Sequence, residues 1–135
     1  MNLSLRSDMA EIAKAKQALQ RFAEQSQLTP SVLQAAELAL DELLTNVVAY
    51  GHAGTAINAI ELTFELEGDA LKIVVSDAGI AFDPFAKRLP PPGPELSLEQ
   101  RQLGGHGIQL VKEFMDSCSY QRQDNRNVIT LRKLL

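Results

Sequence analysis

The stretch Glu42-Leu43-Leu44-Thr45-Asn46 lies late in an apolar segment that runs from about Ser31 to Tyr50. At about 100° per residue, the apolar side chains of this segment gather on one stripe, which predicts a helix. The stripe consists of Leu33, Ala36, Leu40, Leu43, Leu44 and Val47. Glu42 and Asn46 are four residues apart, so they project side by side from a different face. We therefore expect the fold to be organised around a largely apolar helix that carries one polar pair.

This polar pair needs a physical reason. Burying it without partners would cost on the order of 1–3 kcal/mol for each unsatisfied group, and more for a charge. One interpretation is a capped or water-bridged pair at the edge of a helix. The other is a site for a metal ion and a proton, because Mg²⁺ prefers oxygen ligands and a carboxylate can accept a proton from an attacking hydroxyl. Glu-x-x-x-Asn alone does not decide between them.

Composition places the chain among ordinary soluble globular proteins. Its 135 residues are enough for one domain with a sizeable core, and 45% hydrophobic and 22% charged residues are typical of such domains. The net charge of −4 and the lack of a basic stripe argue against direct nucleic-acid binding. No apolar run approaches the roughly 20 residues of a membrane helix, and the first residues lack a secretory signal. We therefore expect no membrane association.

Cysteine and histidine point to a cytoplasmic protein without a zinc centre. The single cysteine, Cys118, excludes an internal disulfide, fits a reducing compartment and is interpreted as a small core residue. The two histidines, His52 and His106, fall in expected loops and not at metal-ligand spacing.

The order of the expected elements indicates the fold class. They are a short strand at Leu3 and Leu5, a helix from about Asp8 to Gln25, a helix opened by Thr29 and Pro30, strands at Ile57–Leu66 and Leu71–Val75, a helix from Gly107 to about Asp116, and strands at Ser117–Gln123 and Asn127–Leu134. In the first hairpin, the inward side chains are Ile60, Leu62, Phe64 and Leu66. Tight turns at 67–69 and 124–126 predict an α+β fold, with a mixed, mainly antiparallel sheet and helices on one face. A doubly wound dinucleotide fold is disfavoured.

A second motif, Asp77-Ala78-Gly79-Ile80-Ala81-Phe82-Asp83-Pro84, follows a predicted strand. A carboxylate at a strand end can accept a hydrogen bond from an exocyclic amine, such as that of adenine. Gly79 lets a flat ring approach the backbone because it has no Cβ. The alternative is a simple Asp-x-Gly turn.

A third motif, Gly104-Gly105-His106-Gly107, opens the next helix. Free backbone N–H groups at a helix start, beside glycines, can bind phosphate. Before it, four prolines between Lys87 and Glu95 predict an extended segment. Loops of this length are usually functional lids or disordered connectors.

In this order, the three motifs resemble the GHKL superfamily of ATPases and kinases, and within it the small bacterial anti-sigma factor serine/threonine kinases. The resemblance covers essentially the whole chain. It implies a single histidine-kinase-like ATP-binding domain over residues 1–135, of the Bergerat-type two-layer α/β sandwich, with ATP held between the helices and a lid at about 83–104.

The resemblance also implies roles for individual residues. Glu42 would be the general base on a serine or threonine hydroxyl, and Asn46 would coordinate Mg²⁺. Arg101 would balance charge on the γ-phosphate, although a solvated lid arginine is an equal alternative. The implied cofactor-binding residues are Asn46, Asp77, Gly79, Gly104, Gly105, His106 and Gly107.

Two positions depart from the family pattern. Members often carry histidine four residues after the asparagine, where this chain has Tyr50, with His52 two residues further on. Relatives commonly begin the last strand with Gly-Thr, whose threonine supports the adenine-binding aspartate. Here Arg126-Asn127 occupies that place, so Asn127 is the expected substitute and Thr130 the weaker one.

The resemblance implies a Mg-ATP-dependent kinase that phosphorylates a small STAS-type anti-sigma antagonist and binds a sigma factor. Relatives often dimerise, so a homodimer is included among the expectations. Two alternatives remain open at this stage. One is a nucleotide-dependent partner-binding module without kinase activity, and the other is a detached histidine-kinase-type ATPase domain. The first expected helix contains no histidine, which argues against an intact two-component kinase.

Overall fold

The computed structural model describes residues 1–50, 59–86 and 107–135 of the chain. Its elements follow the order expected from the sequence. They are β1 (Asn2–Arg6), the 3-10 turn η1 (Met9–Glu11), α1 (Ile12–Ser26), α2 (Pro30–Tyr50), β2 (Ala59–Glu67), β3 (Ala70–Asp77), β4 (Ser117–Gln123) and β5 (Arg126–Leu134). Residues 107–114 form a further helix. None of the helices in these described ranges is long and apolar enough to cross a membrane.

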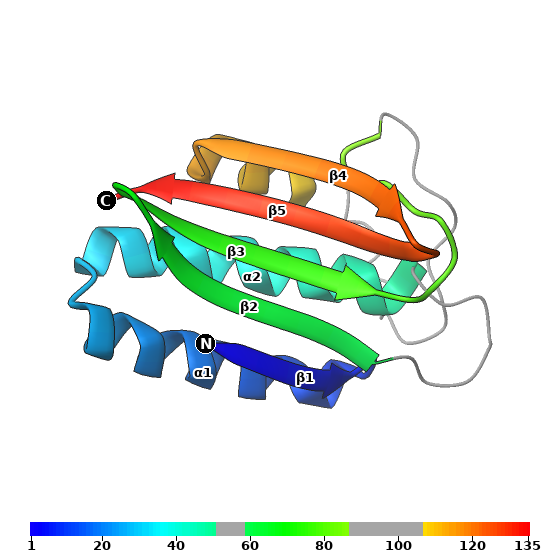
Figure 1. Cartoon of the computed structure of the whole chain (residues 1–135), viewed down its shortest axis with the longest axis horizontal. Coiled ribbons are helices and arrows are strands. Elements are labelled where there is room, and N and C mark those ends of the chain that lie inside the picture. Colours follow the sequence, from blue (N-terminus) through cyan, green and yellow to red (C-terminus); the bar gives the residue numbers. More distant parts are fainter. Residues whose placement is uncertain (51–58, 87–106) are drawn as a thin grey trace.

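The five strands form one sheet in the order β1-β2-β3-β5-β4, and all four pairings are antiparallel. Figure 1 shows α1, α2 and helix 107–114 together behind the sheet, so they cover one of its faces. The expected α+β fold with helices on one face is therefore confirmed. The C-terminal end of α2 lies at the side of the molecule where β3 ends and β5 begins (Figure 1).

Local hydrogen bonds explain where the two long helices begin and end. Asp8 Oδ1 accepts a hydrogen bond from Ala10 N at 2.9 Å and so caps the η1 turn that leads into α1. After α1, Gln27 takes the left-handed conformation that commonly ends a helix, with φ 57°. Thr29 Oγ1 accepts a hydrogen bond from Val32 N at 3.4 Å at the start of α2, as its position predicted.

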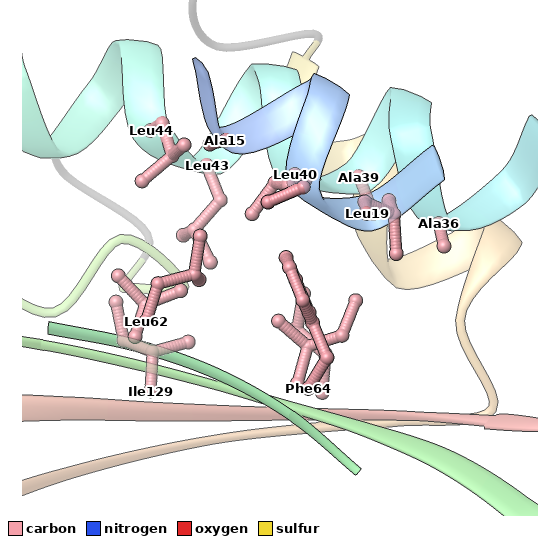
Figure 2. Packing of buried hydrophobic residues seen from close by; sticks show 14 of the residues in the cluster. Ala15, Leu19, Ala36, Ala39, Leu40, Leu43, Leu44, Leu62, Phe64 and Ile129 are labelled. Carbon is pink, nitrogen blue, oxygen red and sulfur yellow. The ribbon is translucent and has the colours of Figure 1, made fainter. Parts of the chain in front are cut away.

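The hydrophobic core fills the space between the sheet and the helices. Figure 2 shows Phe64 reaching from the sheet toward Leu19 of α1 and Leu40 of α2, and all three side chains are fully buried. Phe64 also lies 6.0 Å from Phe22, measured between ring centroids. One predicted core position is wrong. Leu66 keeps the inward alternation of β2, but it lies beside the hairpin turn at the end of the sheet and is 46% exposed.

The helix-facing side of the sheet changes from apolar to polar at one end. In β3 the fully buried Ile73 and Val75 are followed, two residues on, by the buried Asp77. In β5 the buried Ile129 is preceded by the buried Asn127, which pairs with Asp77 in register. Two polar side chains thus occupy positions where the alternation of the strands would otherwise place core residues.

Candidate functional site

Asn46 carries a buried side-chain oxygen that no described residue satisfies. The residue is 2% exposed, and its Nδ2 donates to the backbone oxygen of Glu42 at 2.7 Å. A carbonyl can only accept, so this contact fixes which side of the amide is Oδ1. Among the described residues, Asn46 Oδ1 is the one buried side-chain oxygen or nitrogen without a hydrogen-bond partner. An unsatisfied buried acceptor costs about 1–3 kcal/mol, so the placement of this oxygen does not serve stability.

Glu42 lies half-buried on α2, against the first residue of helix 107–114. A Cβ at Gly107 would overlap the Glu42 carboxylate, so the two positions pack in this way only because residue 107 has no side chain. Burial raises the pKa of the Glu42 carboxyl above its usual range, and the negative charge of Asp41 raises it further. The carboxylate is consequently a better proton acceptor than that of an exposed glutamate.

Asp77 is the last residue of β3, and one of its two carboxylate oxygens accepts hydrogen bonds from the described residues. Its Oδ1 accepts hydrogen bonds from Gly79 N at 2.9 Å and from Asn127 Nδ2 at 3.2 Å. Within the described ranges, Oδ2 has no hydrogen-bond partner. Burial raises the pKa of the Asp77 carboxyl, while these two hydrogen bonds and the charges of Arg126 and Arg122 act in the opposite direction.

The Asn127 amide lies at the centre of the hydrogen bonds around Asp77. Nδ2 donates to two oxygens, Asp77 Oδ1 at 3.2 Å and Ile80 O at 2.8 Å. Oδ1 accepts from three donors, which are Tyr120 Oη at 2.6 Å, Phe82 N at 3.2 Å and an Arg122 guanidinium nitrogen at 3.2 Å. The same Arg122 nitrogen donates to Gly79 O at 2.8 Å. Oδ1 is therefore held by β4 and the 79–82 segment, and Nδ2 by Asp77 of β3 and the same segment.

Phe82 connects this network to α2. Its side chain is 6% exposed and packs with Ala49, three residues beyond Asn46 on the same helix. Its backbone N–H meanwhile bonds Asn127. The segment after Asp77 is thus fixed to both layers, to the sheet through hydrogen bonds and to the helix through apolar contact.

The structure places most, but not all, of the predicted site residues. Asn127 contacts Asp77 as expected, whereas Thr130 pairs with Val74, three positions further along β3, and does not take that place. The predicted residues outside the described ranges are His52, Arg101, Gly104, Gly105 and His106, and the side chain of Tyr50 is not described either. Functional roles for all of these positions stay predictions.

Sequence reasoning missed Tyr120 and Arg122. The two residues alternate on β4, and Arg122 lies opposite Asn127 in the β4–β5 register. The sequence feature that could have predicted this pairing is the turn between β4 and β5. Asp124 and Asn125 both have positive φ, of 53° and 61°, which marks a two-residue hairpin loop.

The donor set fits Mg²⁺ bound together with phosphates. Mg²⁺ takes one or two protein oxygens and completes its shell with water and phosphate, so a single orphaned amide oxygen at Asn46 suits it. Within the described residues, no group of three or more His, Cys, Asp or Glu side chains could hold a metal by itself.

Comparison with known proteins gives one family match and several relatives. The sequence profile of the histidine kinase-like ATPase domain matches residues 5–133. The serine/threonine-protein kinase BtrW of Bordetella bronchiseptica is 38% identical over 70% of this chain and 65% of its own length. The serine-protein kinase RsbW of Bacillus licheniformis is 31% identical over 63% of this chain and 54% of its own length. The chain therefore spans less than two thirds of the length of these relatives.

A third relative, the serine-protein kinase RsbW of Staphylococcus epidermidis, is 30% identical over 67% of this chain and 59% of its own length. Among solved structures, the histidine kinase AdeS of Acinetobacter baumannii aligns with a TM-score of 0.48 at 15% identity, covering 98% of this chain and 67% of that one.

Proposed function

Because this chain belongs to the histidine kinase-like ATPase domain family, we propose that it is a Mg-ATP-dependent protein kinase that phosphorylates a serine or threonine hydroxyl. The observation that carries the proposal is the arrangement on α2. The buried Asn46 Oδ1, which no described residue bonds, lies one helical turn from Glu42, whose carboxyl pKa is raised by burial. The names of the relatives, serine/threonine-protein kinase and serine-protein kinase, support the same reaction class.

In the proposed reaction, Glu42 accepts the proton of the attacking hydroxyl. A bond forms between that hydroxyl oxygen and the γ-phosphorus, the bond from the γ-phosphorus to the bridging oxygen breaks, and ADP leaves. Mg²⁺, when bound, would neutralise charge on the phosphates, and Asn46 Oδ1 would be its protein ligand. Asp77 would accept a hydrogen bond from the amine of adenine at the other end of the site. Gly107, where helix 107–114 begins, would offer its backbone N–H to a phosphate.

The proposed protein substrate is a small STAS-type anti-sigma antagonist, and the proposed second partner is a sigma factor. This part of the proposal rests on the resemblance to anti-sigma factor kinases alone, whereas the names of the relatives support only the transfer to serine. The genes next to this one would supply the candidate antagonist and sigma factor for testing.

The test measures phosphoryl transfer from γ-labelled ATP to a panel of small antagonist domains in the presence of Mg²⁺. The unaltered chain should label one of them on serine or threonine. Glu42→Gln should lower the rate by roughly 10²–10⁴, the usual contribution of general base catalysis, while ADP binding is kept. Asp41→Asn is the matched control, because it makes the same acid-to-amide change one residue earlier, and it should retain transfer.

Two results would contradict the proposal. Equal transfer by the unaltered chain and Glu42→Gln would remove the base role. ADP-sensitive partner binding without any phosphoprotein would instead favour a nucleotide-dependent binding module.

A further inference from the structure

A cavity separate from the candidate site lies between helix 107–114 and the start of β4, the strand at one edge of the sheet (Figure 1). Its volume is about 360 Å³, and ligand-binding cavities in proteins begin at about 300 Å³, so a small molecule has room in it. None of its lining residues has been assigned to the nucleotide, the metal or the proton transfer above. They are Phe85, Lys112, Met115, Asp116, Ser117 and Cys118.

Three of the lining side chains are apolar or only weakly polar. Met115 is 4% exposed and belongs to the hydrophobic core, and Phe85 packs against that core from the segment that follows β3. Cys118 is half-buried on β4, with its Sγ 3.9 Å from the backbone oxygen of Val111. An apolar ligand group in this cavity would remove their exposed surface from water, which favours binding.

Lys112 brings a positive charge to this cavity without an opposite charge beside it. Its Nζ donates to the backbone oxygen of Phe85 at 3.4 Å and lies 5.9 Å from the centre of the Phe85 ring, and both partners are uncharged. In the described part of the chain, Lys112 forms no ion pair. The acidic lining residue, Asp116, is already bonded to β5, because its Oδ2 accepts from Leu134 N at 2.7 Å and lies 3.8 Å from Lys133 Nζ.

We propose that this cavity, which we call the Lys112 cavity, binds a small organic monocarboxylate with an apolar body. The carboxylate would pair with Lys112 Nζ, in place of the long contact to the Phe85 oxygen, and the apolar body would cover Phe85 and Met115. A single negative charge fits best, because the Asp116 carboxylate would repel a second one. The proposal does not depend on the proposed function, since the two sites share no residue.

Cys118 reports whether the Lys112 cavity is occupied. It is the one cysteine of the sequence, so a thiol reagent labels a single position. Burial raises the pKa of the Cys118 thiol, while the positive charge of Lys112 acts in the opposite direction. A carboxylate bound to Lys112 would cover the thiol and offset that positive charge. Both effects would slow alkylation, because the thiolate is the reactive form.

The experiment measures the rate at which iodoacetamide alkylates Cys118, at fixed pH, as 3-phenylpropanoate or its neutral amide, 3-phenylpropanamide, is added. The two compounds have the same shape and differ in charge. In the unaltered chain, the carboxylate should protect Cys118 with a dissociation constant in the millimolar range, as expected for a ligand of this size. It should bind about two- to fivefold more tightly than the amide, which is the contribution of a partly exposed ion pair, and added salt should reduce this preference.

Two variants test the role of Lys112. Lys112→Gln should bind the amide as the unaltered chain does but lose the preference for the carboxylate. Lys16→Gln is the matched control, because it removes the same charge from α1, and it should keep the preference.

Three results would overturn the proposal. Absence of protection by both compounds, with unchanged NMR signals of the backbone amides of residues 112–118, would show that the cavity does not bind them. Equal affinity for the carboxylate and the amide in the unaltered chain would remove the ion pair. A preference for the carboxylate that persists in Lys112→Gln would assign the ion pair to another residue.

Discussion

The two ends of the candidate site are built in opposite ways. On α2, Asn46 has a buried oxygen without a partner in the described part of the chain, and Glu42 carries a partly desolvated carboxylate. At the end of the sheet, every polar atom of the Asn127 amide is bonded. The first arrangement destabilises the folded state, whereas the second stabilises it. The sheet end is thus a fully hydrogen-bonded polar cluster, whereas the polar groups on α2 are those for which we propose a ligand.

The largest expected effect is a difference in the free energy of unfolding between Asn127→Ala and Asn46→Ala. Asn127→Ala should lower the free energy of unfolding by about 1–3 kcal/mol, since the donors and acceptors around residue 127 would lose their hydrogen-bond partner. Asn46→Ala should change that free energy by no more than about 0.5 kcal/mol, because it loses one hydrogen bond but removes the orphaned oxygen and gains helix propensity. Urea unfolding of both variants measures the contrast.

Equal losses of stability in the two variants would show that the polar groups on α2 serve the fold after all. The stated difference between the two ends would then not exist.

A smaller effect is expected at the contact between Glu42 and Gly107. A Cβ at residue 107 would displace the Glu42 carboxylate, which is the end of a flexible side chain, so Gly107→Ala should fold normally. Transfer should fall by about tenfold because the base is misplaced. The same substitution in a Glu42→Gln background should cost much less, since no base remains to be displaced. Additive losses in this double-mutant cycle would argue that Gly107 acts without Glu42.

The smallest effect concerns pH. The pKa of Glu42 is raised by burial and then by Asp41, and a base must be ionised to act. The transfer rate should therefore be lost as pH falls through a pKa above the usual glutamate range. Asp41→Asn removes the like charge, lowers the pKa of Glu42 and should move this acid limb to lower pH. A pH–rate profile of both proteins tests the direction, and an acid limb that does not move would exclude Glu42 as the group titrating.

The sequence predicted the elements because its periodicities were unambiguous. The helix that carries Glu42 and Asn46 and the strand that ends at Asp77 lie where hydrophobic spacing placed them. Alternation alone overestimated the core at Leu66, because it reports which side a residue faces and not whether helices reach that far. Spacing along the chain also said nothing of how Glu42 would meet Gly107, a contact made between two elements in space.

The hydrogen bonds that Tyr120 and Arg122 donate to Asn127 were missed for a more specific reason. A three-residue turn at 124–126 was expected, but the loop holds two residues, Asp124 and Asn125. That difference sets the register in which Arg122 faces Asn127. Asp-Asn at the centre of a hairpin tolerates positive φ, so the shorter loop was readable in principle. The three hydrogen bonds that Asn127 Oδ1 accepts depend on β4, β5 and the 79–82 segment together. They could therefore not be predicted from the sequence.

The most direct test of the central contrast is the Mg²⁺ dependence of ADP binding, measured by calorimetry with Mg²⁺ and with EDTA. In the unaltered chain and in Tyr120→Phe, Mg²⁺ should strengthen ADP binding by the same factor, because the sheet end does not contact the metal. In Asn46→Ala that factor should fall toward one, while binding in EDTA stays close to that of the unaltered chain. An undiminished Mg²⁺ effect in Asn46→Ala would contradict the account.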